Sequence, residues 1–366
     1  MLHPLLEINR SSLGDVRLVE GASEPLGDQE VRLRIDRFAI TANNVTYAVF
    51  GDVLGYWDFF PTDPPWGRVP AMGWAEITES NNSDVAEGSR YYGWYPMAAE
   101  TTIRATATAD GFRDDGGHRQ PHAAVYRAYV DTHRDPLYDL APDGEDRHAL
   151  LRGLFLTGFL AEEFFADPGS GSDPYFRAQQ VIVVSASSKT AIGFAQRAKD
   201  RGAAAVIGIT SEHNAEFVAG LDYYDTVLTY GGLENLESGL DAVSIDMAGN
   251  PAVLSDVHQR LGERLKYSMT VGRSHHDAPA PATEPMPGPK PELFFAPTEV
   301  SRRREEWGRE DFNRRAAHAL GQFVEGSRSW LTVEHRLGPE ATAAAWRDIY
   351  DGAVAPDVGL VATLHA

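Results

Sequence analysis

The chain of 366 residues contains no cysteine, which excludes disulfide bonds, thiolate nucleophiles, iron–sulfur clusters and every zinc site that needs a thiolate ligand. It also lacks an apolar run near the roughly 20 residues that a membrane-spanning helix requires. The segment MLHPLLEINRS, with which the sequence begins, has no basic stretch followed by an apolar core, as a secretory signal would have. We therefore expect a cytoplasmic protein that does not contact a membrane.

Positive charge is scarce. The formal net charge is -20, from 53 acidic and 33 basic residues. Only four of the basic residues are lysines: Lys189, Lys199, Lys266 and Lys290. A surface with this charge repels the phosphates of nucleic acids, so nucleic-acid binding is not expected. The 43% hydrophobic content is instead sufficient for about two packed domains.

The hydrophobic pattern changes near residue 149. Before it, DQEVRLRIDRFAIT alternates apolar and polar residues as a half-buried strand does, and VPAMGWAEITES does so less cleanly. The aromatic, proline-rich stretch at 51–74 is too irregular for a regular element. After residue 149, a helical segment precedes the short apolar runs VIVVSAS, AAAVIGIT, DTVLTY and AVSIDMA. Strands that alternate with helices predict an α/β domain with a parallel sheet covered on both faces.

The rest of the chain contains one long loop and a helical C-terminal part. The proline density of 275–292 excludes a helix or a central strand there. We expect one charged helix over 304–326 with a salt-bridged, exposed face. A strand, a helix and a final strand, GLVATL, follow it.

The strongest local signal is QQVIVVSASSKTAIGFAQRAKDRGAAAVIGIT. A strand enters a loop of small residues, then a helix and a second strand, which is the unit that presents a helix N-terminus to a pyrophosphate. The residues expected to contact the phosphates are Ser185, Ala186, Ser187, Ser188, Lys189 and Thr190.

The loop departs from the usual glycine-rich fingerprint, because Ser185, Ser188 and Ala191 stand at the glycine positions and Gly193 is displaced by two. A Walker-type loop would need a glycine at Val183 and is not favoured. An ordinary turn without a ligand remains the alternative.

The end of the second strand favours NADP(H) over NAD(H). No acidic residue stands at that strand end, where a carboxylate would bind the ribose hydroxyls and repel a 2′-phosphate. Lys189 is the obvious cation for phosphate contact, and a solvated lysine is the alternative. The residues expected around the adenosine are Thr210, Ser211, Asn214 and Tyr230, with His213 also following the strand.

The order of these segments resembles the medium-chain dehydrogenase/reductase superfamily, particularly its quinone oxidoreductase and enoyl reductase branch. More narrowly, TANNVTYAVFGD, YWDFFP, SASSKTA and ELFFAP resemble the DUF2855 family. The resemblance implies a GroES-like β-rich catalytic domain at 1–148 and 329–366, and a Rossmann NADP-binding domain at 149–328. It also identifies AVSIDMAGN with the fourth Rossmann strand, which adds Ala248 and Gly249 to the cofactor-binding residues.

The resemblance also indicates that zinc is absent. Zinc-dependent relatives place a cysteine and a His-Glu pair where this chain has Thr41, Trp74 and Ala75, none of which can serve as the required ligand. His275 and His276 are adjacent and precede a proline-rich stretch, so we interpret them as a solvated loop pair. No metal is expected.

In zinc-free relatives the hydride passes between the nicotinamide and a conjugated acceptor. Asn43, Asn44 and Tyr47 are expected on a turn that faces the nicotinamide, with Thr157 as a further catalytic candidate. Val271 and Gly272 would pass close to the carboxamide. The acceptor would lie between the turn with Asn43 to Tyr47 and the edge of the nucleotide domain that contains Thr157 and Gly272. An aromatic acceptor pocket could include Tyr56, Trp57, Phe59, Phe60, Phe294 and Phe295. Packed core aromatics, Tyr47 among them, are the alternative.

Two functions remain open at this point. The first is an NADPH-dependent reductase of a quinone, an enone or another conjugated carbonyl compound. The second is an NADP(H)-binding protein without turnover, acting as a redox sensor or partner subunit. Fold alone cannot choose between them, and a homodimer is compatible with both.

Overall fold

The computed structural model describes residues 2–169, 171–247, 249–271 and 286–365. The chain divides into unit 1, Met1–Gly153 with Leu331–Ala366, and unit 2, Leu154–Trp330. The sequence places these boundaries after residues 148 and 328. They differ because the first turns of helix α3 (Gly144–Ala166) pack within unit 1. There, Trp74 Nε1 donates to the backbone oxygen of Glu145 at 2.8 Å.

Unit 1 contains a closed β-barrel. Its strands are β3 (Glu30–Ile40), β5 (Pro70–Ser80), β6 (Arg90–Pro96), β9 (Ala128–Asp131), β8 (Gly111–Asp114) and β7 (Glu100–Thr108). Neighbours in this order pair, and β7 also pairs antiparallel with β3, which closes the barrel. Period-2 burial explains β3, because Leu33 and Ile35 are fully buried whereas Arg34 between them is exposed. Strand β5 matches the less clean alternation of VPAMGWAEITES, and the irregular stretch predicted over 51–74 therefore ends before Pro70.

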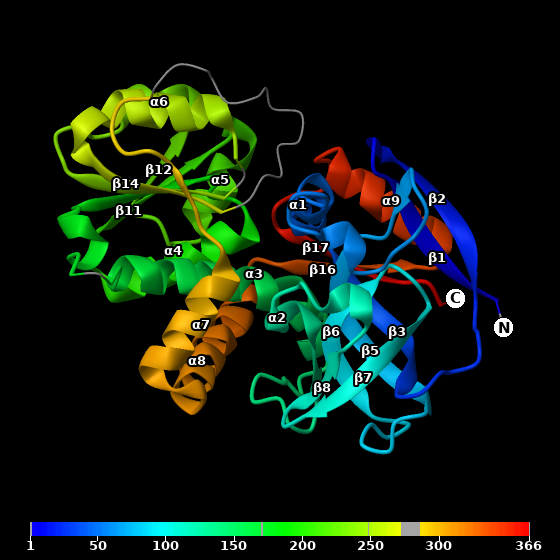
Figure 1. Cartoon of the computed structure of the whole chain (residues 1–366). Coiled ribbons are helices and arrows are strands. Elements are labelled where there is room, and N and C mark those ends of the chain that lie inside the picture. The colour runs from blue at the N-terminus through cyan, green and yellow to red at the C-terminus, as the bar shows by residue number, and fades with distance from the viewer. Residues whose placement is uncertain (1, 170, 248, 272–285, 366) are drawn as a thin grey trace. The chain divides into compact units, whose positions relative to one another are not determined.

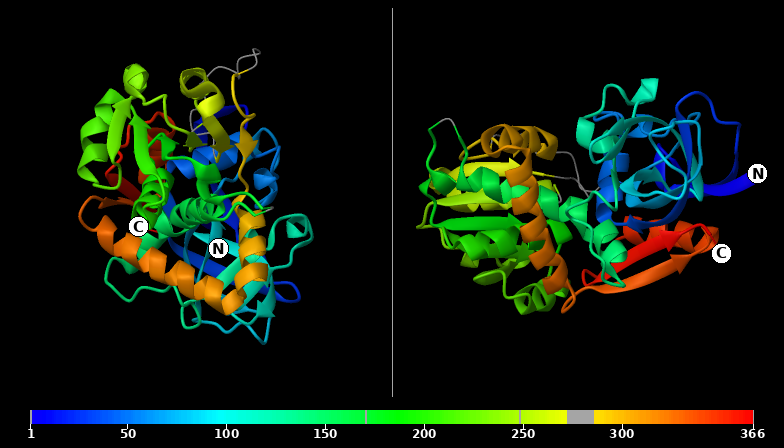
Figure 2. Two further views of the ribbon diagram at one scale, coloured as in Figure 1. Left: turned by 90° about the vertical axis from the view of Figure 1, so that its left-hand side faces the viewer. Right: turned by 90° about the horizontal axis from the view of Figure 1, so that it is seen from below.

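The C-terminal segment returns to unit 1, as the sequence predicts. Strand β17 (Val358–Thr363) pairs antiparallel with β3, and β16 (Thr332–Leu337) pairs parallel with β17 across helix α9 (Pro339–Tyr350). Figures 1 and 2 show these red and orange segments beside the blue N-terminal strands. The remaining elements of unit 1 are β1 (Leu2–Asn9), β2 (Ser12–Ala22), β4 (Trp66–Gly67), α1 (Ala42–Val49), η1 (Tyr56–Asp58), η2 (Gly117–Arg119) and α2 (Ala124–Arg127).

Unit 2 is a parallel sheet in the order β12-β11-β10-β13-β14-β15. The strands are β10 (Gln180–Val184), β11 (Ala205–Thr210), β12 (Thr226–Thr229), β13 (Ala242–Asp246), β14 (Leu265–Thr270) and β15 (Glu292–Leu293). Their helices include α3, α4 (Lys189–Arg201), α5 (Ala215–Gly220) and α6 (Pro251–Leu261). This strand order is that of the dinucleotide-binding fold, so the predicted fold class is confirmed.

Helices cover both faces of this sheet. In Figure 1, α6 lies on one face and α3 and α4 lie on the other. Ile182, Ile207 and Ile209 of the sheet pack with Val253 and Val257 of α6 in one buried cluster. Residues at alternate positions of a strand point to opposite faces. Gly208 and Thr210 of β11 therefore point to the α4 face.

Two glycines allow α3 and α4 to lie very close together. A Cβ atom added at Gly158 would lie 2.6 Å from the backbone oxygen of Thr190 and 2.8 Å from the backbone nitrogen of Phe194. At Gly193 it would lie 3.0 Å from a ring atom of Phe155. The position of the first turns of α4 therefore depends on α3.

The single charged helix predicted over 304–326 is two helices, α7 (Ala296–Trp307) and α8 (Arg309–Ser327). Gly308 between them has φ 82°, a left-handed conformation that ends a helix. The charged side chains of the predicted range, such as Arg304, Glu310 and Arg314, are exposed as expected, whereas Arg303, just before it, is only 1% exposed.

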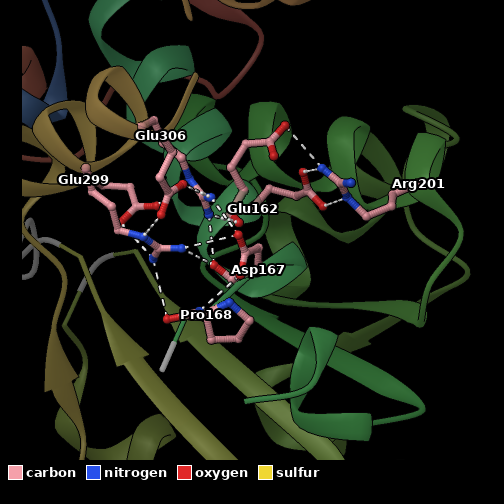
Figure 3. Close-up of polar contacts among 10 residues, drawn as sticks. Glu162, Asp167, Pro168, Arg201, Glu299 and Glu306 are labelled. Carbon is pink, nitrogen blue, oxygen red and sulfur yellow. Dashed lines mark hydrogen bonds and ion pairs between the residues drawn. The ribbon is translucent and has the colours of Figure 1, made fainter. Parts of the chain in front are cut away.

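The buried Arg303 of α7 holds the C-terminal end of α3 (Figure 3). Its Nη2 donates to the backbone oxygen of Glu163 in α3 and, at 2.9 Å, to that of Asp167, which follows α3. On the same helix α3, the fully buried Glu162 accepts from Arg201 at 2.8 Å and from the Tyr175 hydroxyl at 2.7 Å. Because buried charges need partners, these contacts fix the relative position of the helices in unit 2.

Candidate functional site

The sheet of unit 2 has one position at which the strand order reverses. From β10 the chain passes through α4 to β11 on one side, and from β13 it passes through α6 to β14 on the other. Open α/β sheets bind ligands outside the carboxyl ends of the strands at this position. The loop 185–188 after β10, with Met247, Gly249 and Asn250 after β13, therefore forms the candidate dinucleotide-binding region.

The loop after β10 fits a pyrophosphate. Ser185 has φ 61°, the left-handed conformation that a glycine usually supplies at this position. Ser188 is the N-cap of α4, and its hydroxyl oxygen accepts from the backbone N–H of Ala191 at 3.2 Å. Lys189 and Thr190 form the first turn of α4, where backbone N–H groups and the helix dipole favour an anion.

Three side chains from later segments hold this loop. The Tyr224 hydroxyl donates to the backbone oxygen of Ala186 at 2.7 Å. Asn214 Nδ2 donates to the Ser187 hydroxyl at 3.0 Å, and the hydroxyls of Tyr230 and Ser185 lie 3.4 Å apart. Asn214 and Tyr230, predicted at the adenosine, thus contact the loop itself. Tyr224 is not predicted from the sequence, where its one signal is a glycine, Gly208, inside the β-branched strand β11.

The carboxyl end of β11 contains the other adenosine candidates. Thr210 is fully buried, and its hydroxyl has no hydrogen-bond partner among the described residues. Ser211 is half-buried and precedes η4 (Glu212–Asn214). Glu212, for which no role is predicted from the sequence, is an exposed carboxylate in this turn.

A backbone hydrogen bond joins the carboxyl ends of β13 and β14. The backbone oxygen of the buried Asp246 accepts from the backbone N–H of Val271 at 2.8 Å, and its side chain accepts from the N–H of Gly249 at 3.0 Å. Gly249 has φ 69°, a left-handed conformation that favours glycine. The predicted residues Ala248 and Gly272 and the pair His275 and His276 lie outside the described residues.

The other candidates in unit 2 lie on or beside helices. Thr157 is half-buried on α3. The ring of Phe294 lies 6.3 Å from that of Phe164, and Phe295 precedes α7 with 37% of its surface exposed. Phe294 therefore packs against α3, and Phe295 is the more accessible of the two.

Asn43, Asn44 and Tyr47 lie on helix α1, and not on the turn that the sequence predicts. The helix begins there because Thr41 is its N-cap and Asn44 completes a capping box. Asn44 Oδ1 accepts from the backbone N–H of Thr41 at 2.7 Å, and its Nδ2 donates to the backbone oxygen of Pro70 at 2.9 Å. Both ends of the Asn44 amide are thus used to hold α1.

Tyr47 has the geometry of a hydrogen-bond donor. Its hydroxyl lies 3.5 Å from Trp94 Nε1, which can only donate, so the Tyr47 oxygen accepts there. The same hydroxyl also hydrogen-bonds to the Asn43 side chain. Burial raises the pKa of Tyr47 above its ordinary value, and the neighbouring Tyr56 raises it further. The phenol consequently stays protonated at neutral pH.

Aromatic rings surround Tyr47 in unit 1. The ring of Tyr47 lies 4.6 Å from that of Tyr56, whose hydroxyl lies 3.2 Å from the hydroxyl of Tyr126. Phe59 lies 5.5 Å from Tyr56. Trp57 is 2% exposed and occupies space that a Cβ atom at Gly51 would enter, which makes it a core residue. Phe60 is also buried.

The residues at the positions of the zinc ligands have structural roles. Trp74 is fully buried in β5, as is Ala75 beside it, and Thr41 caps α1. Over the part of the chain that the structure describes, no three histidine, aspartate or glutamate residues are arranged to hold a metal. None of the described helices is long and apolar enough to cross a membrane.

Solved structures share this fold over nearly the whole chain. CurA from Vibrio vulnificus, solved in complex with NADPH, matches with a TM-score of 0.63 at 13% identity, covering 99% of each chain. A putative NADPH:quinone reductase from Bacillus thuringiensis has a TM-score of 0.57 at 13% identity, again with 99% of each chain covered. A probable oxidoreductase from Mycobacterium abscessus has a TM-score of 0.55 at 14% identity and the same coverage.

Similarity in sequence is more restricted. No curated protein matches the chain. One family model matches residues 38–355, which include α1, the barrel strands after β3, the whole of unit 2 and α9. The chain therefore belongs to the family described as "Protein of unknown function (DUF2855)".

Proposed function

We propose that the protein is a zinc-independent, NADPH-dependent oxidoreductase that transfers hydride to a quinone, an enone or another conjugated carbonyl acceptor. The observation that carries the proposal is the loop 185–188, which joins β10 to the capped helix α4 at the reversal of the strand order. The structural relatives support the choice of cofactor, because CurA is described in complex with NADPH and the Bacillus thuringiensis relative as a putative NADPH:quinone reductase.

Bound NADPH would supply the hydride from its nicotinamide ring. Backbone N–H groups of the loop and the first turn of α4 would hold the pyrophosphate, and Lys189 would lie near the 2′-phosphate. Tyr47 would donate a hydrogen bond, or its proton, to the acceptor oxygen on which negative charge develops. Its oxygen accepts from Trp94, and its O–H is the group that would donate to the acceptor.

Cofactor preference tests the first part. Lys189→Ala should weaken binding of NADPH more than that of NADH, whereas Glu212→Gln should strengthen NADPH binding, because it removes a carboxylate that repels the phosphate. Lys199→Ala is the matched control, since Lys199 lies in the last turn of the same helix and pairs with Asp225. Fluorescence titration gives the dissociation constants. Equal affinity of the wild type for NADPH and NADH would contradict the preference.

Turnover tests the second part. Tyr47→Phe should lower kcat by roughly 10- to 1,000-fold, the scale of one donor or general acid, while NADPH affinity stays unchanged. Tyr95→Phe is the control, because this buried tyrosine donates to the backbone oxygen of Tyr91 within the barrel. A loss of NADPH affinity in Tyr47→Phe would instead make Tyr47 a structural or cofactor residue. Activity should survive exhaustive chelation, and one tightly held zinc per chain would refute the zinc-free proposal.

The second candidate is an NADP(H)-binding protein without turnover, which would act as a redox sensor or partner subunit. It is favoured by the 7% exposure of Tyr47 and by the Asn44 amide, which is already used within α1. The two candidates differ in a screen of NADPH oxidation against quinones, enones and aldehydes. Tight binding without oxidation of NADPH by any acceptor would select the sensor.

A further inference from the structure

We propose that Tyr224 is a positioning residue that sets the direction of the phosphate-binding N–H groups in the loop 185–188. The inference rests on the proposed function, because it concerns the same dinucleotide site. Tyr224 follows α5 and precedes β12, and it is 9% exposed. It would touch no part of the cofactor, so that it acts only through Ala186.

The Ala186 residue is fixed on both sides. Its N–H donates to the backbone oxygen of Ile209 in β11 at 3.0 Å, and its backbone oxygen accepts from the Tyr224 hydroxyl at 2.7 Å. In a planar trans peptide the C=O of one residue and the N–H of the next point in opposite directions. The hydroxyl that holds the Ala186 oxygen therefore also directs the Ser187 N–H away from Tyr224.

Gly208 provides the space for this contact. A Cβ atom added there would lie 2.7 Å from ring atom Cδ1 of Tyr224 and 3.1 Å from Cβ of Ala186. Gly208 points to the α4 face of the sheet, so the Tyr224 ring crosses β11 on the face that the loop covers. A glycine inside a strand marks such a close approach.

The loop needs this support because it lacks the usual glycines. Ser185 adopts φ 61° although it has a side chain, a conformation that persists only where the surroundings enforce it. Asn214 and Tyr230 contact hydroxyl oxygens of the loop. Tyr224 instead donates to a backbone oxygen of the loop, that of Ala186.

The position of this contact predicts which ligands are affected. NADPH and NADH share the pyrophosphate, whereas adenosine 2′-monophosphate has none. Tyr224→Phe keeps the ring and removes only the hydroxyl. It should weaken the binding of NADPH and of NADH by the same factor, about 3- to 30-fold, on the scale expected when a buried carbonyl loses its hydrogen-bond donor. Binding of adenosine 2′-monophosphate should not change.

The experiment is a fluorescence titration of the full chain with each of the three ligands. It is done at a temperature below the unfolding transition of every variant. Gly208→Ala is the second variant, since the added Cβ displaces the Tyr224 ring without removing its hydroxyl, and it should weaken the same two dinucleotides. Tyr223→Phe is the matched control, because the Tyr223 hydroxyl hydrogen-bonds to Gln196 of α4. Hydrogen exchange should also speed up for the amides of residues 186–188 in Tyr224→Phe.

The outcomes separate the two proposals. Unchanged NADPH and NADH affinity in Tyr224→Phe, with a wild type that binds both, overturns the role of Tyr224 and leaves the proposed function intact. Weaker binding of NADPH alone also overturns the role of Tyr224, because the effect would then lie at the 2′-phosphate. A wild type that binds neither dinucleotide overturns both proposals.

Discussion

The crossing of α3 and α4 at Gly158 allows a sharp prediction about stability. In the interior of a helix, alanine is favoured over glycine by about 1 kcal/mol. On local grounds alone, Gly158→Ala should therefore stabilise the protein. The tertiary structure reverses this expectation, because the added Cβ would lie 2.6 Å from the Thr190 oxygen and 2.8 Å from the Phe194 nitrogen. Both are backbone atoms, so no side chain can rotate away.

The magnitude follows from opposing terms. Overpacking of a core costs about 1–3 kcal/mol, occasionally more, and a clash with two backbone atoms belongs at the upper end, since α4 must move as a whole. After subtraction of the helix-propensity gain, Gly158→Ala should destabilise unit 2 by about 1–2 kcal/mol. Because α4 begins at the phosphate loop, NADPH affinity should fall as well.

Gly321 offers a matched control. It lies inside α8, and a Cβ atom there would meet nothing within 4 Å. Gly321→Ala should therefore stabilise the protein by about 1 kcal/mol. Urea unfolding of the wild type and both variants measures the two changes. Because helix propensity cancels between the variants, their difference is the packing energy at the crossing. Equal stabilisation by both would refute the close approach of α3 to α4.

Two further predictions concern buried charge. Arg303→Ala should cost about 3 kcal/mol, the lower end for breaking a buried ion pair, because it removes the closer of the two guanidinium partners of the buried Glu299 and leaves only Arg302 at 3.4 Å, whereas Arg314→Ala, at a largely exposed pair, should cost less than about 1 kcal/mol in the same unfolding assay. Burial, with Arg152 nearby, lowers the pKa of His148 to about 4. The folded state therefore keeps His148 neutral while the unfolded state takes up a proton below about pH 6.5. Wild-type stability should fall by up to roughly 3 kcal/mol as the pH drops from about 6.5 to 4, and then level off. His148→Gln should remove that part of the pH dependence in unfolding curves at pH 7 and 4.5, and an unchanged slope would contradict the burial.

The sequence by itself determined the elements whose signal is local. Alternation of apolar and polar residues predicted β3, and the apolar runs at 180–184, 205–210 and 242–246 predicted three strands of the parallel sheet. Side-chain periodicity is a property of a few consecutive residues, so it can be read without knowing the partner strand. The small-residue loop at 185–188 was predicted for the same reason.

Only the tertiary structure decided how these elements meet. The pairing of β7 with β3 that closes the barrel, and the order of the six parallel strands, depend on contacts between residues far apart in the chain. The same holds for the Tyr224 hydroxyl on Ala186 and for the burial of Arg303. A tyrosine or an arginine has the same local signal whether it is solvated or packed. Its role is fixed by the partner that the fold brings to it, because hydrogen bonds and ion pairs gain their importance from burial.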